Sequence, residues 1–294
     1  MANAAVGEPL ALRSAVTKWA AQSAFGTAST LTTSLGIGLA GFNKNSNNAR
    51  FRGPGSPNVV AKKGGSVYTD WNVKFPAAQT GIKALLLKAV RASGVLPYIS
   101  LGIGYEDDES TSNKSVERIR DSVITGLNLS YDCFNDHAPL VADLTGFGTV
   151  VDTITNLTKA TLTTKPWMSY EAAVLMEGAA YVLPKLDLSV AHTVSRDYVA
   201  PGSTPASNPR APNYITCHDE VITGSISRFQ ALGHNVLANT VGDKDIGIIW
   251  TSLDDSVVLT LVLTDCDFAN ERHEETEQGL RWSADFEANS WGLS

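Results

Sequence analysis

The spacing of apolar residues predicts a chain with more helix than strand. In several segments apolar residues recur every three or four positions, which places them on one face of an α-helix. Another segment is rich in alanine and other good helix formers before Pro184. The predicted helices cover 9–24, 82–90, 116–127, 169–183 and 219–241.

Strict alternation of apolar and polar residues is confined to shorter segments. Residues 66–75 alternate and are followed by Pro76, which predicts a half-buried strand. A short buried strand is predicted at 96–104. The β-branched segments 246–253 and 256–264 flank Asp254 and Asp255, which favours a β-hairpin. The predicted fold class is therefore α+β, with a predominantly helical body, short strands and a C-terminal β-hairpin.

Runs of glycine, proline, serine and asparagine divide the chain. Residues 43–65 have the composition of a flexible arm, and 199–214 that of an exposed loop. The predicted organisation is a basic N-terminal region with a helix and an arm, a helical or mixed core, the exposed loop, and a C-terminal part that packs on the same core and ends in an acidic tail. The corresponding residues are 1–69, 70–198, 199–214 and 215–294.

Charge is unevenly distributed along the chain. Residues 1–69 hold seven basic residues and one acidic residue, a net charge of +6, which leaves −13 for the rest of a chain whose total is −7. Only 18% of all residues are charged, below the roughly 25% that is usual for soluble domains. A subunit covered by copies of itself needs less charge, because interface cores are depleted in Lys, Glu and Asp. The composition therefore favours self-assembly.

The basic arm and the acidic tail hold the candidate binding residues. The arm contains five positive charges and an aromatic ring, which could contact phosphates and stack on a base without sequence preference. Its alternative partner is the acidic body of the same or a neighbouring subunit. The candidate nucleic-acid-binding residues are Lys44, Arg50, Phe51, Arg52, Lys62 and Lys63. In the tail, Trp282, Phe286 and Trp291 are candidate interface anchors.

No catalytic or metal-binding motif is found. The sequence has no phosphate-binding loop, dinucleotide fingerprint, nucleophile elbow or zinc-protease helix. Cys217 and His218 are adjacent, and Cys133 lies four residues before His137, which is unlike a zinc-knuckle spacing. We therefore predict no catalytic residues, metal ligands or cofactor. The carboxylate pairs at 254–255 and 265–267 leave an unrecognised enzyme as an alternative.

These patterns lead to a functional hypothesis. The chain is expected to be a self-assembling structural protein, most plausibly a virus capsid or nucleocapsid subunit whose basic N-terminal region faces RNA or DNA. The alternatives are a cytosolic enzyme or small-molecule-binding protein, and a nucleic-acid-binding accessory protein. The first residues lack a signal-peptide pattern, and the longest nearly apolar stretch, 31–42, is too short to span a bilayer. The expected location is the virion or the host cytoplasm, with no membrane partner.

Overall fold

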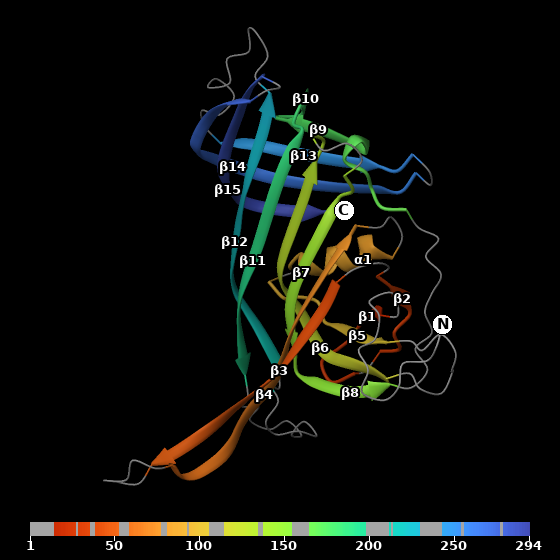
Figure 1. Ribbon diagram of the computed structural model, residues 1–294, viewed down its shortest axis with the longest axis vertical. Helices are drawn as coiled ribbons and strands as arrows, with labels where there is room; N and C mark the ends of the chain where they lie inside the picture. The colour runs from red at the N-terminus through yellow and green to blue at the C-terminus, as the bar shows by residue number, and fades with distance from the viewer. Residues whose placement is uncertain are drawn as a thin grey trace.

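The structure of the protein, a computed structural model, is nearly all β (Figure 1). It describes residues 15–27, 29–35, 39–52, 59–77, 81–92, 94–105, 115–134, 138–154, 165–197, 212, 214–229, 243–253, 256–276 and 279–294. Fifteen strands form one sheet in which every pairing is antiparallel. The predicted α+β class with a helical body is therefore wrong.

The strands occur throughout the chain, with helical turns only between β4 and β5 and before β9 in the described residues. In chain order the elements are β1 (Ala15–Ala21), β2 (Thr33–Ser34), β3 (Leu39–Arg52), β4 (Val59–Pro76), α1 (Ile82–Leu86), the 3₁₀ turn η2 (Leu87–Ala89), β5 (Ile99–Tyr105), β6 (Ser115–Asp132), β7 (Val141–Gly148), β8 (Val150–Ile154), the 3₁₀ turn η3 (Ser169–Glu171), β9 (Ala172–Met176), β10 (Ala179–Tyr181), β11 (Lys185–Asp197), β12 (Tyr214–Phe229), β13 (Lys244–Thr251), β14 (Val258–Thr276) and β15 (Gly279–Leu293).

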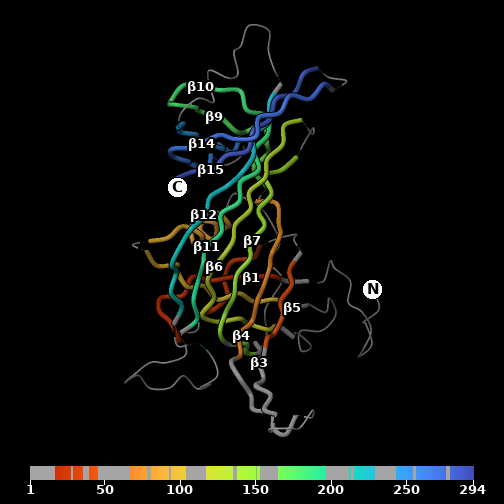
Figure 2. Tube along the Cα trace, turned by 90° about the vertical axis from the view of Figure 1, so that its left-hand side faces the viewer, coloured from red at the N-terminus to blue at the C-terminus, as the bar shows by residue number. Residues whose placement is uncertain are grey.

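Strand β6 links two parts of the sheet. Its first half pairs with β5 and β8, and its second half pairs with β7 and β11. The main path continues from β11 through β12, β15, β14, β13 and β9 to β10, while β7 leads to β4 and β3. As Figure 1 shows, β14 and β15 lie at one end of the long axis, and the β3–β4 hairpin extends from the other end. Figure 2, turned by 90°, again shows β14 and β15 at one end of the sheet.

One hydrophobic core runs through most of the sheet. On β11, Leu186, Leu188 and Val190 are buried and alternate with more exposed residues, as expected for a strand with one face in the core. The core includes residues from Trp19 in β1 to Leu293 in β15. The N-terminal and C-terminal parts of the chain therefore contribute to the same buried cluster.

Most of the predicted helices are strands. Residues 116–127 lie within β6, and 219–229 belong to β12. The segment 169–183 forms η3, β9 and β10 instead of one helix, and 15–21 of the first predicted helix is strand β1. Parts of two of these strands, 17–20 of β1 and 121–124 of β6, are buried on both faces, so buried residues do not alternate there. Residues 9–14 and 230–241 of the predicted helices lie outside the described residues.

Several local predictions are confirmed. Residues 66–75 lie in β4, 82–90 contain α1 and η2, and 96–104 contain most of β5. The predicted C-terminal hairpin is β13–β14. The acidic tail is instead the long hairpin β14–β15, with β15 between β14 and β12. The predicted loop 199–214 lies almost entirely outside the described residues. Within the described part of the chain, no helix is long and apolar enough to span a membrane.

Candidate interface surfaces and polar centres

The basic arm is a two-stranded β-ribbon. Strand β4 pairs with β7 from Pro76 to Thr69 and then continues to Val59, where β3 is its only partner among the described residues. The pairing with β3 extends through Ser46↔Val67 to Arg52↔Val59. We call the paired segments 46–52 and 59–67 the basic ribbon. The predicted flexible arm is thus wrong for these residues, because cross-strand pairing forms a hairpin despite many glycine and asparagine residues.

The candidate nucleic-acid residues divide between the ribbon and its base. Arg50 lies directly opposite Lys62 in the β3–β4 register, and Ala49 lies opposite Lys63. The register therefore places two basic residues at one level of the ribbon. Phe51 lies opposite Ala61, and Arg52 lies opposite Val59 across a register shift.

Lys44 differs from the other candidates because it contacts the body of the protein. Its Nζ lies 2.7 Å from Glu117 Oε1 of β6 and 5.7 Å from the centre of the Phe42 ring. The Lys44 side chain is half exposed, so this ion pair is weak. Lys44 therefore lies at the base of the ribbon rather than on its projecting part.

The three aromatic residues proposed as interface anchors are held within the chain. Trp282 is 0% exposed, and its indole nitrogen lies 3.4 Å from Glu271 Oε2. Phe286 is 3% exposed. Trp291 is half-buried and donates a 2.6 Å hydrogen bond to Glu220 Oε1. Trp282 and Phe286 contribute to the core of β15 and offer little surface to a neighbour.

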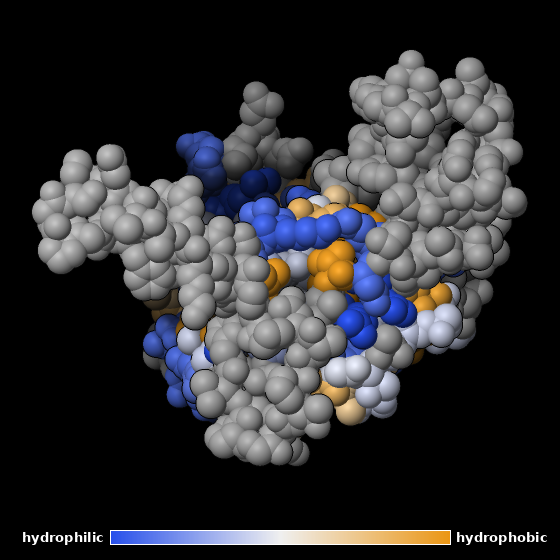
Figure 3. Space-filling view, turned by 90° about the horizontal axis from the view of Figure 1, so that it is seen from below, coloured by the Kyte–Doolittle hydropathy of each residue, from blue (hydrophilic) through white to orange (hydrophobic). Residues whose placement is uncertain are grey.

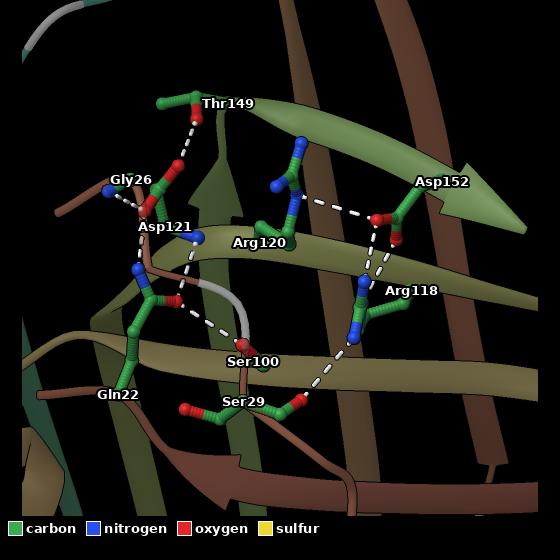
Figure 4. A network of polar contacts seen from close by, with 9 residues as sticks. All are labelled: Gln22, Gly26, Ser29, Ser100, Arg118, Arg120, Asp121, Thr149 and Asp152. Carbon is green, nitrogen blue, oxygen red and sulfur yellow. Dashed lines mark hydrogen bonds and ion pairs between the residues drawn. The ribbon is translucent and has the colours of Figure 1, made fainter. Parts of the chain in front are cut away.

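A buried carboxylate marks the point where β6 changes partners. Asp121 is 3% exposed and has a left-handed backbone, with φ 51°. Figure 4 shows its carboxylate between three donors from two segments: Oδ1 accepts hydrogen bonds from the Gln22 amide and from the Gly26 N–H at 2.6 Å, and Oδ2 accepts one from Thr149 Oγ1 at 3.1 Å. Ser100 Oγ and the Asp121 N–H each donate to Gln22 Oε1 at 3.1 Å.

This network, which we call the Asp121 centre, is structural in character. All the donors to the carboxylate are neutral, and they tie the residues after β1 and the residue before β8 to the bulge in β6. Sequence reasoning missed it. The only signal was an acidic residue between the apolar Ile119 and Val123, and an acid that is buried must be hydrogen-bonded.

A second polar cluster, also in Figure 4, joins β6 to β8. Asp152 accepts hydrogen bonds from Arg118 at 2.9 and 2.6 Å, and Arg120 Nε lies 3.4 Å away. Burial raises the pKa of Asp152, but the hydrogen bonds and charge of Arg118, together with the charge of Arg120, outweigh burial and lower it. This carboxylate therefore stays ionised, and Arg118 clamps it in the bidentate geometry typical of strong pairs.

The residues considered for thiol or metal chemistry are not arranged for it. Burial raises the pKa of Cys133, Cys217 and Cys266, in the last case to about 12, so the thiols stay protonated. His218 contacts Ser195 Oγ at 2.8 Å. Among the described residues, no three His, Cys, Asp or Glu side chains gather in a way that could hold a metal ion.

His192 is a buried titratable group between β11 and its neighbours. Its Nε2 lies 2.8 Å from the Ala89 carbonyl oxygen, so Nε2 donates, and its Nδ1 lies 3.5 Å from Glu220 Oε1. Burial lowers the pKa of His192, an effect that the Ala89 hydrogen bond and the charge of Glu220 oppose and the charge of Arg91 reinforces. His192 thus joins η2 to β12 but faces no open cavity among the described ones.

The end of the molecule from which the ribbon extends has a mixed surface. In the view from below, the described residues form small hydrophilic and hydrophobic patches side by side (Figure 3). Cation–π contacts are also found at this end of the sheet: the Arg196 guanidinium lies 3.8 Å from the Tyr68 ring centre and 4.5 Å from that of Phe147. Arg196 thereby fastens the base of β4 to β7 and β11.

Comparison with known proteins identifies no family for this chain. No family model matches the sequence, and no curated protein matches it.

Proposed function

We propose that the protein is a self-assembling structural subunit of the kind that forms a virus capsid or nucleocapsid. The observation that carries this proposal is the basic ribbon. It extends past β7, and no third strand pairs with it among the described residues. A two-stranded hairpin alone is at best marginally stable in water. A ribbon of this kind gains stability by contact with another molecule, which suits a subunit that reaches towards a neighbour.

Charge and composition support the same proposal. The low charged fraction of 18% suits a chain whose surface is largely covered by copies of itself. The protonated thiols and the neutral surroundings of the Asp121 carboxylate give no activated nucleophile at these positions. An enzyme or small-molecule binder is therefore the weaker alternative.

Nucleic acid is a second candidate partner of the ribbon. The register position of Arg50 opposite Lys62 favours this role, because it gathers basic residues that can neutralise phosphates. In this version of the proposal the subunit encloses RNA or DNA with the ribbon facing inward. The implied location is a virion or the host cytoplasm.

The test is the mass of the purified protein by light scattering between 50 mM and 1 M NaCl, with absorbance at 260 and 280 nm to detect nucleic acid. We expect large assemblies whose mass falls as salt rises, because the screening length decreases from about 14 to about 3 Å. A salt-independent monomer without nucleic acid would refute the proposal.

A shortened chain makes the test specific. Because Ser46 lies opposite Val67, replacing residues 47–66 by Asn-Gly should close a tight hairpin and remove the ribbon while retaining the body. This variant should remain folded and lose assembly. The matched control, Lys83→Gln with Lys88→Gln, removes two positive charges elsewhere and should assemble normally.

A further inference from the structure

A polar depression lies on the outer face of the sheet, which is the opposite face from the one on which Phe286 of β15 points into the core. Its floor is formed by two rows of side chains that run across β6, β11, β12, β15 and β14 in register. One row is Ser130, Asp187, Ser225, Asp285 and Ala269, and the other is Asn128, Ser189, Thr223, Glu287 and Asp267. We call these two rows the acidic trough.

The trough is hollow because its floor consists mainly of short side chains. It has a volume of about 650 Å³ and is open to solvent. The residues between the two rows, including Leu188 and Phe286, point into the core on the other face. The trough is therefore a face of the sheet that no other described element covers.

The charge of the trough is entirely negative. Its lining includes Asp187, Asp267, Asp285 and Glu287 but neither lysine nor arginine. Asp187 and Asp285 have basic neighbours beside the trough: Lys185 Nζ lies 3.5 Å from Asp187, and an Arg272 nitrogen lies 3.2 Å from Asp285.

The remaining two acids face each other without a counter-ion. Asp267 and Glu287 lie directly opposite each other on β14 and β15, and both are exposed. Neither side chain has a hydrogen bond or ion pair with another described residue. Two carboxylates at opposite positions destabilise a strand pair, so the free trough carries a repulsion that a basic ligand would relieve.

The ribbon complements the trough in charge and size. Its opposite pair Arg50↔Lys62 is the positive counterpart of Asp267↔Glu287. The ribbon strand from Ser46 to Arg52 has six residue steps, about 20 Å, and five neighbouring strands of the trough span about 19 Å. One ribbon laid across the strands would therefore reach from one side of the trough to the other.

The ribbon of the same chain is badly placed to occupy the trough. Ser130 of β6 lies opposite Val141 of β7, which in turn lies opposite Pro76 of β4. The ribbon leaves the sheet only beyond Thr69 of β4. Seven residue steps of β4, about 23 Å, separate these levels, and the ribbon continues away from the trough. Figure 1 places the β3–β4 hairpin and the β14–β15 end of the sheet at opposite ends of the molecule.

We propose that the basic ribbon of one copy lies across the acidic trough of the next copy. This inference rests on the proposed self-assembly and names the contact that produces it. The two surfaces are different patches at opposite ends of one chain, so the contact is head-to-tail and generates a ring or an open filament rather than a two-fold dimer. Each contact brings the basic residues of a ribbon to the facing carboxylates of Asp267 and Glu287.

Charge reversal tests the pairing directly. The ribbon variant carries Arg50→Glu with Lys62→Glu, and the trough variant carries Asp267→Lys with Glu287→Lys. Either variant alone places like charges in every contact, and we expect the protein concentration needed for assembly to rise about tenfold or more. An equimolar mixture should assemble again, because each ribbon then meets an oppositely charged trough.

The readouts are light scattering, absorbance at 260 nm, and thermal unfolding of each variant. Unfolding temperatures close to that of the wild type establish that the reversed residues leave the fold intact. If a reversed variant unfolds early, the neutral pairs Arg50→Gln with Lys62→Gln and Asp267→Asn with Glu287→Gln replace it, and both must weaken the salt dependence of assembly.

The possible results separate the contact from the wider proposal. Recovery in the mixture supports the ribbon–trough contact. If both single variants assemble like the wild type, the contact is wrong although self-assembly stands. If only the ribbon variant fails, loses nucleic acid and is not rescued, the ribbon binds nucleic acid and the inference is overturned. A wild-type chain that never assembles refutes the proposed function itself.

Discussion

The Asp121 centre should make a large contribution to stability. Replacing Asp121 by alanine removes the acceptor of three hydrogen bonds, and it leaves the Gly26 N–H and the Thr149 hydroxyl without their partner. The Gln22 amide retains one bond, to the Ala24 carbonyl oxygen at 2.8 Å. A stranded buried donor costs about 1–3 kcal/mol. The loss of stability from the two donors together is then about 3 kcal/mol, because the Thr149 hydroxyl can rotate and so costs less than the fixed Gly26 N–H.

The backbone adds a second contribution. Asp121 has φ 51°, a conformation that aspartate and asparagine tolerate but that costs most other residues about 1–2 kcal/mol. Asp121→Ala should therefore lower the free energy of unfolding by about 4 kcal/mol. Asp121→Gly relieves the backbone and should cost about 3 kcal/mol, whereas Asp121→Asn retains one acceptor and should cost about 1.5 kcal/mol.

Urea unfolding followed by tryptophan fluorescence measures these differences, provided that the slope against urea is unchanged. The exposed residue Val182 supplies the control, since Val182→Ala should change stability by less than about 0.5 kcal/mol. An Asp121→Ala protein within about 1 kcal/mol of the wild type would refute the role of the network. A glycine variant more stable than the wild type would refute the order of the two contributions, because backbone strain would then outweigh the lost acceptors.

Four further predictions concern single positions. Burial lowers the pKa of His192 below its ordinary 6.5, so the folded state binds this proton less readily than the unfolded state. The contribution of His192 to stability should therefore be full above about pH 6.5 and fall as the pH decreases. His192→Gln should remove this pH dependence in a series of unfolding temperatures from about pH 8 to about pH 5. The lowered pKa of Asp152 has the same sign but acts at lower pH: its contribution is present above about pH 4 and lost as the pH falls through the lower folded pKa. Arg118→Met should therefore weaken the acid stability of the wild type in acid titrations followed by circular dichroism. Cys266, which is 0% exposed with a pKa raised to about 12, should react with a thiol reagent only after unfolding, and rapid labelling of the native protein would contradict its burial. A Cβ at Gly146 would lie 2.2 Å from a backbone oxygen of Val123, so Gly146→Ala should cost about 1–3 kcal/mol in urea unfolding, and an unchanged midpoint would contradict this packing.

The local pattern of the sequence determines those elements that have one face in the core. The strand at 66–75 alternates because β4 presents Trp71, Val73 and Phe75 to the core and polar residues outward. The short helix at 82–86 buries Ile82, Leu85 and Leu86 at helical spacing. In both cases the period of the side chains alone reports the backbone conformation.

Strand β6 could not be recognised in this way. Its ladder is displaced by the left-handed residue Asp121 and again between Ile124 and Gly126. Each irregularity shifts the face on which the next apolar residue lies. The buried positions Ile119, Val123, Ile124 and Leu127 therefore do not alternate strictly. Their intervals include the four-residue spacing of a helix, although every one of them is in a strand.

The charges were readable from the sequence, but their geometry was not. The net charges of +6 for residues 1–69 and −13 for the rest of the chain are evident from composition. They indicate that surfaces of opposite charge exist. Only the long-range pairing of β14 with β15 brings Asp267 opposite Glu287, and only the pairing of β3 with β4 brings Arg50 opposite Lys62. The members of each pair, although no more than twenty positions apart in the sequence, become neighbours only when the register of the hairpin is fixed. The core that the strands share decides that register.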